Sequence, residues 1–359
     1  MKLTVFTKDQ TAALKGLATM MLVLHHSFQQ AWYYDGFAIN FMPFSESFVV
    51  KLAVTCKICV AIFAFISGYG LFLSCIKEPD SPDWAQKWVY ERYIKTFSGY
   101  WFVWIASIIV CHFLNNLPAF RYFADGRTNG CLYMLLDFMG VASLFATPML
   151  NGSWWYMSAA LVFILITPIL AKNKNNLLWI ALLVVVFPRV ISGTNGDGVY
   201  TGQNSAYAFL GAFLAGCIFA RYHLFDTIAS LKYKPVRFVL ELCLILALYK
   251  MYHIIPASKF WEIRFALFPV VVIVFLNEFV LNIPVLRNIL RFVGKHSMNI
   301  FMTHTFISGT FLRNFIYSHE HWLLIFGVLL ILSILLSLAI ELIKKITRYD
   351  FCVHKWLLS

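Results

Sequence analysis

Apolar runs long enough to cross a lipid bilayer recur along almost the whole of this 359-residue chain. A helix needs about 20 mostly apolar residues to span the hydrocarbon core. Hydrophobic residues make up 60% of the sequence and charged residues only 13%, about half the charged share of an average soluble domain. The runs therefore predict an all-α, polytopic membrane protein that forms a single domain over residues 1–359, with no separate water-soluble domain.

The runs divide the chain into about ten expected transmembrane helices. One further run, residues 132–147, is apolar but too short to be counted with them, and it carries Asp137. The expected helices cover residues 11–32, 48–76, 96–114, 155–170, 177–191, 206–222, 236–252, 263–281, 297–315 and 322–343.

The distribution of lysine and arginine decides how the chain is oriented. These residues occur in short loops between the apolar runs, so the net charge of +12 reports topology and not a nucleic-acid-binding surface. If residues 132–147 crossed the membrane, every later loop would change side and most later cations would be external, against the positive-inside rule. We therefore predict a re-entrant or interfacial segment near residues 132–150 and both termini in the cytoplasm. The cations that this topology leaves outside are Arg121, Arg127, Arg189, Lys250, Lys259, Arg264 and Arg313.

The first expected helix carries Lys15 near its start and His26 near its middle. Because the two residues are eleven positions apart, their side chains lie within about 20° of the same helix face. They are separated by about 16 Å along the axis, so His26 is near the bilayer midplane if Lys15 is at the surface. Ionisable groups at that depth are costly, and they usually face a functional site.

A neutral imidazole at this position can act as a general base, because it can remove a proton from a hydroxyl group that attacks a carbonyl carbon. We therefore predict that His26 is catalytic. His25 points about 100° away on the helix, where a functional role and a supporting hydrogen bond are both open.

Four further segments follow this one in the chain and extend the pattern. They are Phe65-Ile66-Ser67-Gly68-Tyr69, Arg92-Tyr93-Ile94-Lys95 with Tyr100-Trp101, Trp155-Tyr156-Met157-Ser158-Ala159-Ala160 with Pro168, and Gly294-Lys295-His296-Ser297 with Ile300 and His304. Together with Lys15 to His26, and in this order, they closely resemble the acyltransferase 3 family of integral-membrane acyltransferases. The resemblance covers nearly the whole chain.

The chain departs from the family pattern in two places. The family usually has arginine where this chain has Lys15, so the charge is kept but the bidentate fork is lost. Some relatives carry a glutamate in the mid-chain segment, where this chain has Ala160 or Leu161. A carboxylate that assists the base would then have to come from elsewhere, and Asp137 and Glu278 are the candidates.

The resemblance implies transfer of an acyl group, usually acetyl, from cytoplasmic acetyl-CoA or another acyl-CoA to a hydroxyl group, with no metal ion. The acceptor would be a cell-surface polysaccharide, a glycolipid or a lipid-linked sugar, and the enzyme would be a multi-pass protein of the cell membrane. The phosphates of the donor need cations on the cytoplasmic face. The residues expected to bind them are Lys15, Arg92 and Lys95.

Four residues are candidates for acceptor binding, and each has a structural alternative. Lys57, if it lies at mid-depth, lines a watery path or extends toward an interface. Ser67 is an acyl acceptor or a small residue that allows close helix packing. Trp155 stacks on a sugar or belongs to the aromatic material of the spans and interfaces. His304 takes part in the site or is a hydrogen-bonded core histidine.

A different class of function also fits the sequence. About ten spans, a central histidine and a mid-span Lys57 are compatible with a proton-coupled transporter or flippase for a glycan or small metabolite. A non-catalytic scaffold would explain the hydrophobicity but not the ordered segments. A carrier would move solute into vesicles without an acyl donor, whereas an enzyme would consume the thioester.

Overall fold

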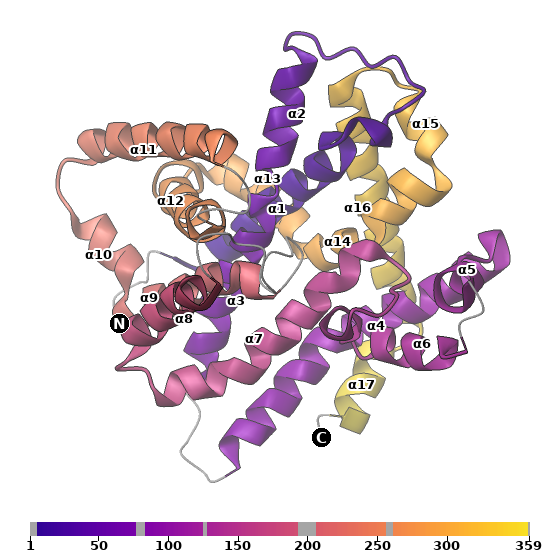
Figure 1. The fold of residues 1–359 in the computed structure, drawn as a ribbon, viewed down its shortest axis with the longest axis horizontal. Coiled ribbons are helices and arrows are strands. Elements are labelled where there is room, and N and C mark those ends of the chain that lie inside the picture. Colours follow the sequence, from indigo (N-terminus) through magenta and orange to yellow (C-terminus); the bar gives the residue numbers. More distant parts are fainter. Residues whose placement is uncertain (1–5, 77–82, 125–127, 193–205, 256–260, 358–359) are drawn as a thin grey trace.

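The computed structural model describes residues 6–76, 83–124, 128–192, 206–255 and 261–357, with side chains described outside 185–192. This part of the chain is helical and forms no β-strand, as the sequence predicts; one isolated bridge joins Asn40 and His321 (Figure 1). The α-helices are α1 (Lys8–Phe28), α2 (Glu46–Thr55), α3 (Ile58–Cys75), α4 (Trp84–Asn115), α5 (Leu117–Phe123), α6 (Gly130–Phe138), α7 (Trp155–Lys172), α8 (Leu177–Ser192), α9 (Leu210–Tyr222), α10 (Leu224–Ser230), α11 (Lys234–Ile254), α12 (Phe268–Phe275), α13 (Pro284–Lys295), α14 (Ser297–Thr305), α15 (Arg313–Tyr317), α16 (Trp322–Ile346) and α17 (Tyr349–Leu357).

Several helices are long and apolar enough to cross a membrane, so the chain is a multi-pass helical membrane protein. In the described residues there are five such helices, or six if the pair Tyr207–Tyr222 and Leu224–Ser230, bent by 66°, forms one span. All lie on runs that the sequence marks as spans, but the predicted total of about ten is not confirmed, because the other expected spans form helices that are shorter or more polar. The five are Glu46–Cys75, Trp84–Asn115, Gly152–Lys172, Ile263–Val280 and Trp322–Ile346.

The run near residues 132–150 forms two short elements. Helix α6 has nine residues and is about 13 Å long, less than half the thickness of a hydrocarbon core. A 3₁₀ turn, Ala142–Phe145, follows it. This segment therefore leads back toward the start of α7 without the length that a crossing requires.

Two pairs of glycines set the closest helix contacts. A Cβ on Gly16 of α1 would lie 1.9 Å from the Leu290 carbonyl oxygen of α13, and one on Gly294 of α13 would lie 1.8 Å from the Ala12 oxygen of α1. Helices α3 and α9 meet in the same way through Gly68 and Gly216 (Figure 1). Small residues at such crossings let helix backbones approach within van der Waals contact. Three of the segments that carry the family resemblance thus contain glycines that the packing requires, namely Gly16, Gly68 and Gly294.

We expect Gly68→Ala to destabilise the protein by about 1–3 kcal/mol, because the added Cβ would lie 2.0 Å from the Phe213 carbonyl oxygen and the two helices would have to separate. Gly70→Ala is the matched control, since it lies in the same helix and its Cβ would meet nothing within 4 Å. The control should be neutral or stabilising by up to about 1 kcal/mol through helix propensity. Thermal unfolding in detergent compares the two, and equal midpoints would contradict the packing argument.

Candidate functional site

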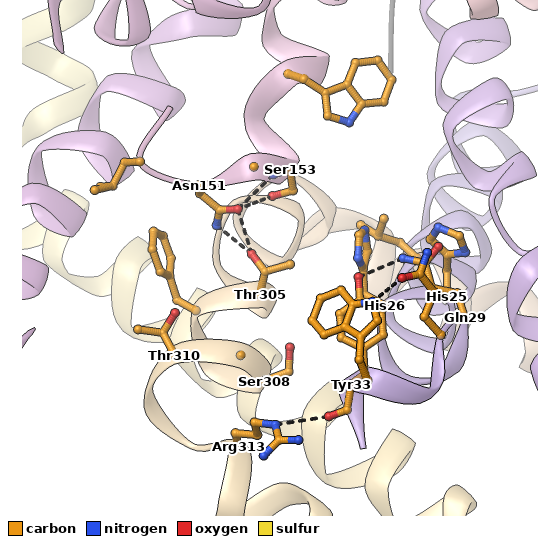
Figure 2. A pocket seen from close by; sticks show the side chains of 18 of the residues that line it. His25, His26, Gln29, Tyr33, Asn151, Ser153, Thr305, Ser308, Thr310 and Arg313 are labelled. Atoms are coloured by element: carbon orange, nitrogen blue, oxygen red, sulfur yellow. Dashed lines mark hydrogen bonds between the residues drawn. The ribbon is translucent and has the colours of Figure 1, made fainter. Parts of the chain in front are cut away.

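A cavity of about 610 Å³ lies beside the C-terminal half of α1, at the end of that helix opposite Lys15. Its size falls in the range of small-molecule binding sites. In Figure 2, His25, His26 and Gln29 form one wall, and Asn151, Ser153 and Thr305 face them across the cavity. The described lining residues are Leu22, His25, His26, Gln29, Gln30, Trp32, Tyr33, Lys57, Val60, Leu117, Arg121, Leu150, Asn151, Gly152, Ser153, Trp155, Thr305, Phe306, Ser308, Gly309, Thr310 and Arg313.

His26 occupies the α1 wall and is half-buried. Helix α1 begins with a capping box, in which the Thr7 hydroxyl accepts from the Gln10 backbone N–H and the Gln10 side chain accepts from the Thr7 backbone N–H. The His26 ring centroid lies 5.0 Å from that of His25 and 5.0 Å from that of His304. The helix thus carries His26 into a cluster of three imidazoles at the cavity wall.

His25 stabilises the interruption between α2 and α3. Helical bonding is interrupted around Cys56 and Lys57, and the Ala53 carbonyl accepts a hydrogen bond from His25 Nδ1 at 2.8 Å. A carbonyl only accepts, so His25 carries its proton on Nδ1. The adjacent Val54 carbonyl is bonded by the Tyr252 hydroxyl at 3.1 Å. His25 is therefore a supporting residue, and the break that it stabilises brings Lys57 to the cavity wall.

His304 lies behind His26 and is fully buried. Its Nδ1 is 2.8 Å from the Ile300 carbonyl, so Nδ1 carries the proton and Nε2 is an acceptor. Nε2 is buried and bonds to none of the described residues. An acceptor beside His26 is suited to stabilise a proton on that imidazole.

A second wall is built from residues 150–155 and the end of α14. The Asn151 side-chain oxygen accepts from the Ser153 backbone N–H at 3.0 Å and from the Thr305 hydroxyl at 2.9 Å. The Trp154 indole donates to the Met302 carbonyl at 3.0 Å. The π-helical turn Phe306–Phe311 then continues along the cavity, and such turns are frequent at functional sites.

Asp137 fixes this second wall from outside the cavity. Its carboxylate is almost fully buried and accepts hydrogen bonds from the Tyr100 hydroxyl, the Trp104 indole, the Tyr122 hydroxyl and the Leu150 backbone N–H. Leu150 immediately precedes Asn151, so Asp137 at the end of α6 connects that helix to the polar wall of the cavity.

Neither carboxylate that the sequence offered as an assistant to His26 lines the cavity. Asp137 is engaged by the four donors above, and Glu278 pairs with Arg237 beside a separate small pocket. The groups that the structure places beside His26 are the imidazoles of His25 and His304, and the Lys57 side chain lines the same cavity.

The residues predicted to bind the donor lie away from the cavity. Lys15 is half-buried next to the crossing of α1 and α13. The Arg92 guanidinium lies 5.6 Å from the Trp88 ring centroid, and Lys95 forms an exposed ion pair with Glu91 at 3.0 Å. The structure does not bring these cations together with His26.

Two of the predicted acceptor-binding residues, Lys57 and Trp155, line the cavity, whereas His304 packs against His26 and Ser67 lies outside it, beside Tyr156. Within the described residues, no group of three histidine, cysteine or acidic side chains is arranged to hold a metal ion. The remaining polar lining was not predicted from the sequence, although Asn151-Gly152-Ser153 immediately precedes the mid-chain aromatic segment and is typical of a helix start. The polar lining residues that were not predicted are Gln29, Gln30, Tyr33, Arg121, Asn151, Ser153, Thr305, Ser308, Thr310 and Arg313.

Comparison with known proteins gives one match. The family described as an acyltransferase domain, acyltransferase 3, matches residues 12–342, which covers every segment that carries the resemblance. Neither the curated proteins nor the solved structures give a match. Because the match spans nearly the entire chain and contains the cavity with His26, the protein belongs to the acyltransferase 3 family.

Proposed function

We propose that the protein is an O-acyltransferase that moves an acyl group, most simply acetyl, from cytoplasmic acyl-CoA to a hydroxyl group of a carbohydrate bound in the cavity. The observation that carries the proposal is the position of His26 on the wall of this cavity, in a chain of an acyltransferase family. The acceptor would be a cell-surface polysaccharide, a glycolipid or a lipid-linked sugar, and the protein would act in the cell membrane with both termini in the cytoplasm.

In the proposed reaction, the oxygen of the acceptor hydroxyl attacks the thioester carbonyl while His26 takes the proton of that hydroxyl. A C–O bond forms and the C–S bond breaks, and the proton then passes from His26 to the departing sulfur of CoA. The Nε2 acceptor of His304 favours the protonated state of His26 between these two steps. His25 retains the geometry of the wall through Ala53.

The donor would approach from the end of α1 that carries Lys15. This cation is about 16 Å along the helix from His26, so a CoA molecule whose thioester lies at His26 would have its phosphates well separated from the cavity. Lys15 is the proposed phosphate contact on α1, with Arg92 and Lys95 as further contacts from α4.

We expect the purified protein in detergent to release CoA thiol from acetyl-labelled acetyl-CoA and to transfer the label to a component of a glycan extract. Thiol release is measured with a thiol reagent, and the label is followed in the glycan fraction. The proposal fails if the thioester is left intact with every extract while the protein in vesicles moves glycan without a donor, because that result would identify a carrier.

A further inference from the structure

The charge of the cavity indicates what kind of acceptor it takes. Three cationic side chains line it, Lys57, Arg121 and Arg313, and no aspartate or glutamate is among the described lining residues. A cavity with low-dielectric walls and one sign of charge concentrates ligands of the opposite sign. The formal charges of the described lining residues are therefore all positive.

These cations are unusual for their place in the chain. The predicted topology leaves few lysines and arginines on the external side, as the positive-inside rule requires. Arg121 and Arg313 are two of those few, and both reach the same cavity from distant parts of the sequence. Topology does not call for the charge of Arg313, so a ligand is a reason for it.

Among the residues that the structure describes, neutral groups hold Arg313 in place. Its Nε donates to the Tyr33 carbonyl at 3.2 Å, and an Nη donates to the Asp35 carbonyl at 2.8 Å (Figure 2 shows the first of these). The guanidinium carbon lies 5.2 Å from the Phe37 ring centroid. Backbone carbonyls and an aromatic ring orient the guanidinium and leave its full charge. They use two of its five N–H groups, so the others are left for a planar anion.

We propose that the acceptor is an anionic carbohydrate, whose carboxylate or phosphate is bound by Arg313 with Lys57 and Arg121 while a neighbouring hydroxyl faces His26. The inference rests on the proposed function, since it names the substrate class of the same site. Arginine binds carboxylate and phosphate through two parallel hydrogen bonds, which fixes the sugar's orientation as well as its affinity. The neutral polar wall of Asn151, Ser153 and Thr305 would then contact the uncharged hydroxyls.

The first test compares matched acceptors with acetyl-CoA as donor. The probes are a glucuronate-containing oligosaccharide, its carboxyl-reduced neutral form, and the neutral form carrying a phosphate. We expect kcat/KM for the two acidic probes to exceed that for the neutral one by about 10- to 100-fold, the range of a charge-assisted hydrogen bond. A preference for only one acidic probe identifies the anion as carboxylate or phosphate. Equal use of the neutral probe would overturn the inference and leave the acyltransferase proposal standing.

The second test replaces the cations. Arg313→Gln should raise KM for the acidic acceptor by about 10- to 100-fold and leave KM for acetyl-CoA unchanged. Arg121→Gln should also raise KM for the acidic acceptor. Because Arg121 lies on another helix, this variant tests the inference even if Arg313→Gln fails to fold. Lys250→Gln is the matched control, because Lys250 is an exposed cation on the same predicted side that does not line the cavity. A rise in KM for acetyl-CoA instead would show that the cations serve the donor.

Binding provides a readout that does not depend on turnover. Calorimetric titration of the wild-type protein should show tighter binding of the acidic oligosaccharide than of its carboxyl-reduced form, with the difference removed in Arg313→Gln. Equal affinities would overturn the inference even if no acyl group is transferred. Absence of thioester consumption together with selective binding of the acidic probe would reject the proposed function alone.

Discussion

His26→Gln is expected to lower kcat for acyl transfer by about 10²- to 10⁴-fold, the usual contribution of a positioned general base. Glutamine is similar in size and keeps hydrogen-bonding capacity, but it does not take up a proton in the physiological range. The KM values for donor and acceptor should change little, because the side chain acts on the hydroxyl only as the C–O bond forms. Steady-state kinetics with acetyl-CoA and an accepted glycan measures both quantities.

His112→Gln is the control for the loss of a histidine, because His112 is exposed on α4 and does not line the cavity. It should retain wild-type kcat. Thermal unfolding of each variant separates a catalytic effect from a folding defect. A His26→Gln protein that unfolds like the wild type and turns over at the wild-type rate would eliminate His26 as the base.

Helices and their rough positions could be predicted from the sequence, because in lipid the backbone has few alternatives and long apolar runs are a direct signal. The number of spans could not be predicted as reliably. Helix α14, for example, ends after nine residues and continues as a π-helical turn at Phe306–Phe311, and nothing in its apolar composition marks that change. Helix α1 carries Lys8, Asp9 and Lys15, which lower its apolarity although it packs at the centre of the fold (Figure 1).

Cavity-lining residues could be predicted where their spacing or charge within one apolar run identifies them. The eleven-residue spacing from Lys15 identifies the face of His26, and a lysine inside an apolar run singles out Lys57. Arg313 and Asn151 could not be found in this way, because they reach the cavity through loops and turns whose course depends on tertiary packing. The segment containing Ser67 illustrates the opposite case, since the structure gives it a packing role through Gly68.

The aromatic residues Tyr100 and Trp101, which lie inside α4, also have a structural explanation in the fold. Tyr100 donates to Asp137, and the Trp101 indole donates to the Phe138 carbonyl at 3.0 Å. These two residues hold the C-terminal end of α6 against α4. Tyr100 and Trp101 belong to a segment that carries the family resemblance, but their contacts in this fold are structural. They fix the start of the segment that leads from Asp137 to Leu150 at the cavity wall.

Asp137→Asn is expected to destabilise the protein by about 2–5 kcal/mol, the cost of disrupting a buried, hydrogen-bonded carboxylate. The four groups around the carboxylate are all donors: two tyrosine hydroxyls, one indole and the Leu150 backbone N–H. The indole, the Tyr122 hydroxyl and the Leu150 N–H all donate to one carboxylate oxygen, Oδ2. An amide NH2 at that position would leave the indole and the backbone N–H without an acceptor, and an amide oxygen there would accept from them without the strength that the negative charge adds. Thermal or denaturant unfolding in detergent measures the loss.

The same substitution should also alter the cavity, because the Leu150 N–H, whose hydrogen bond to the carboxylate would be lost or weakened, adjoins Asn151. We expect KM for the acceptor to rise in protein that remains folded, while thiol release from acetyl-CoA without acceptor is less affected. Asp9→Asn is the matched control, since Asp9 forms an exposed ion pair with Arg291 at 3.1 Å and should contribute no more than about 1 kcal/mol. If Asp137→Asn unfolded like this control and kept the wild-type KM, the wall of residues 150–155 would have to be held by its bonds to α14 alone, through Asn151 and Trp154.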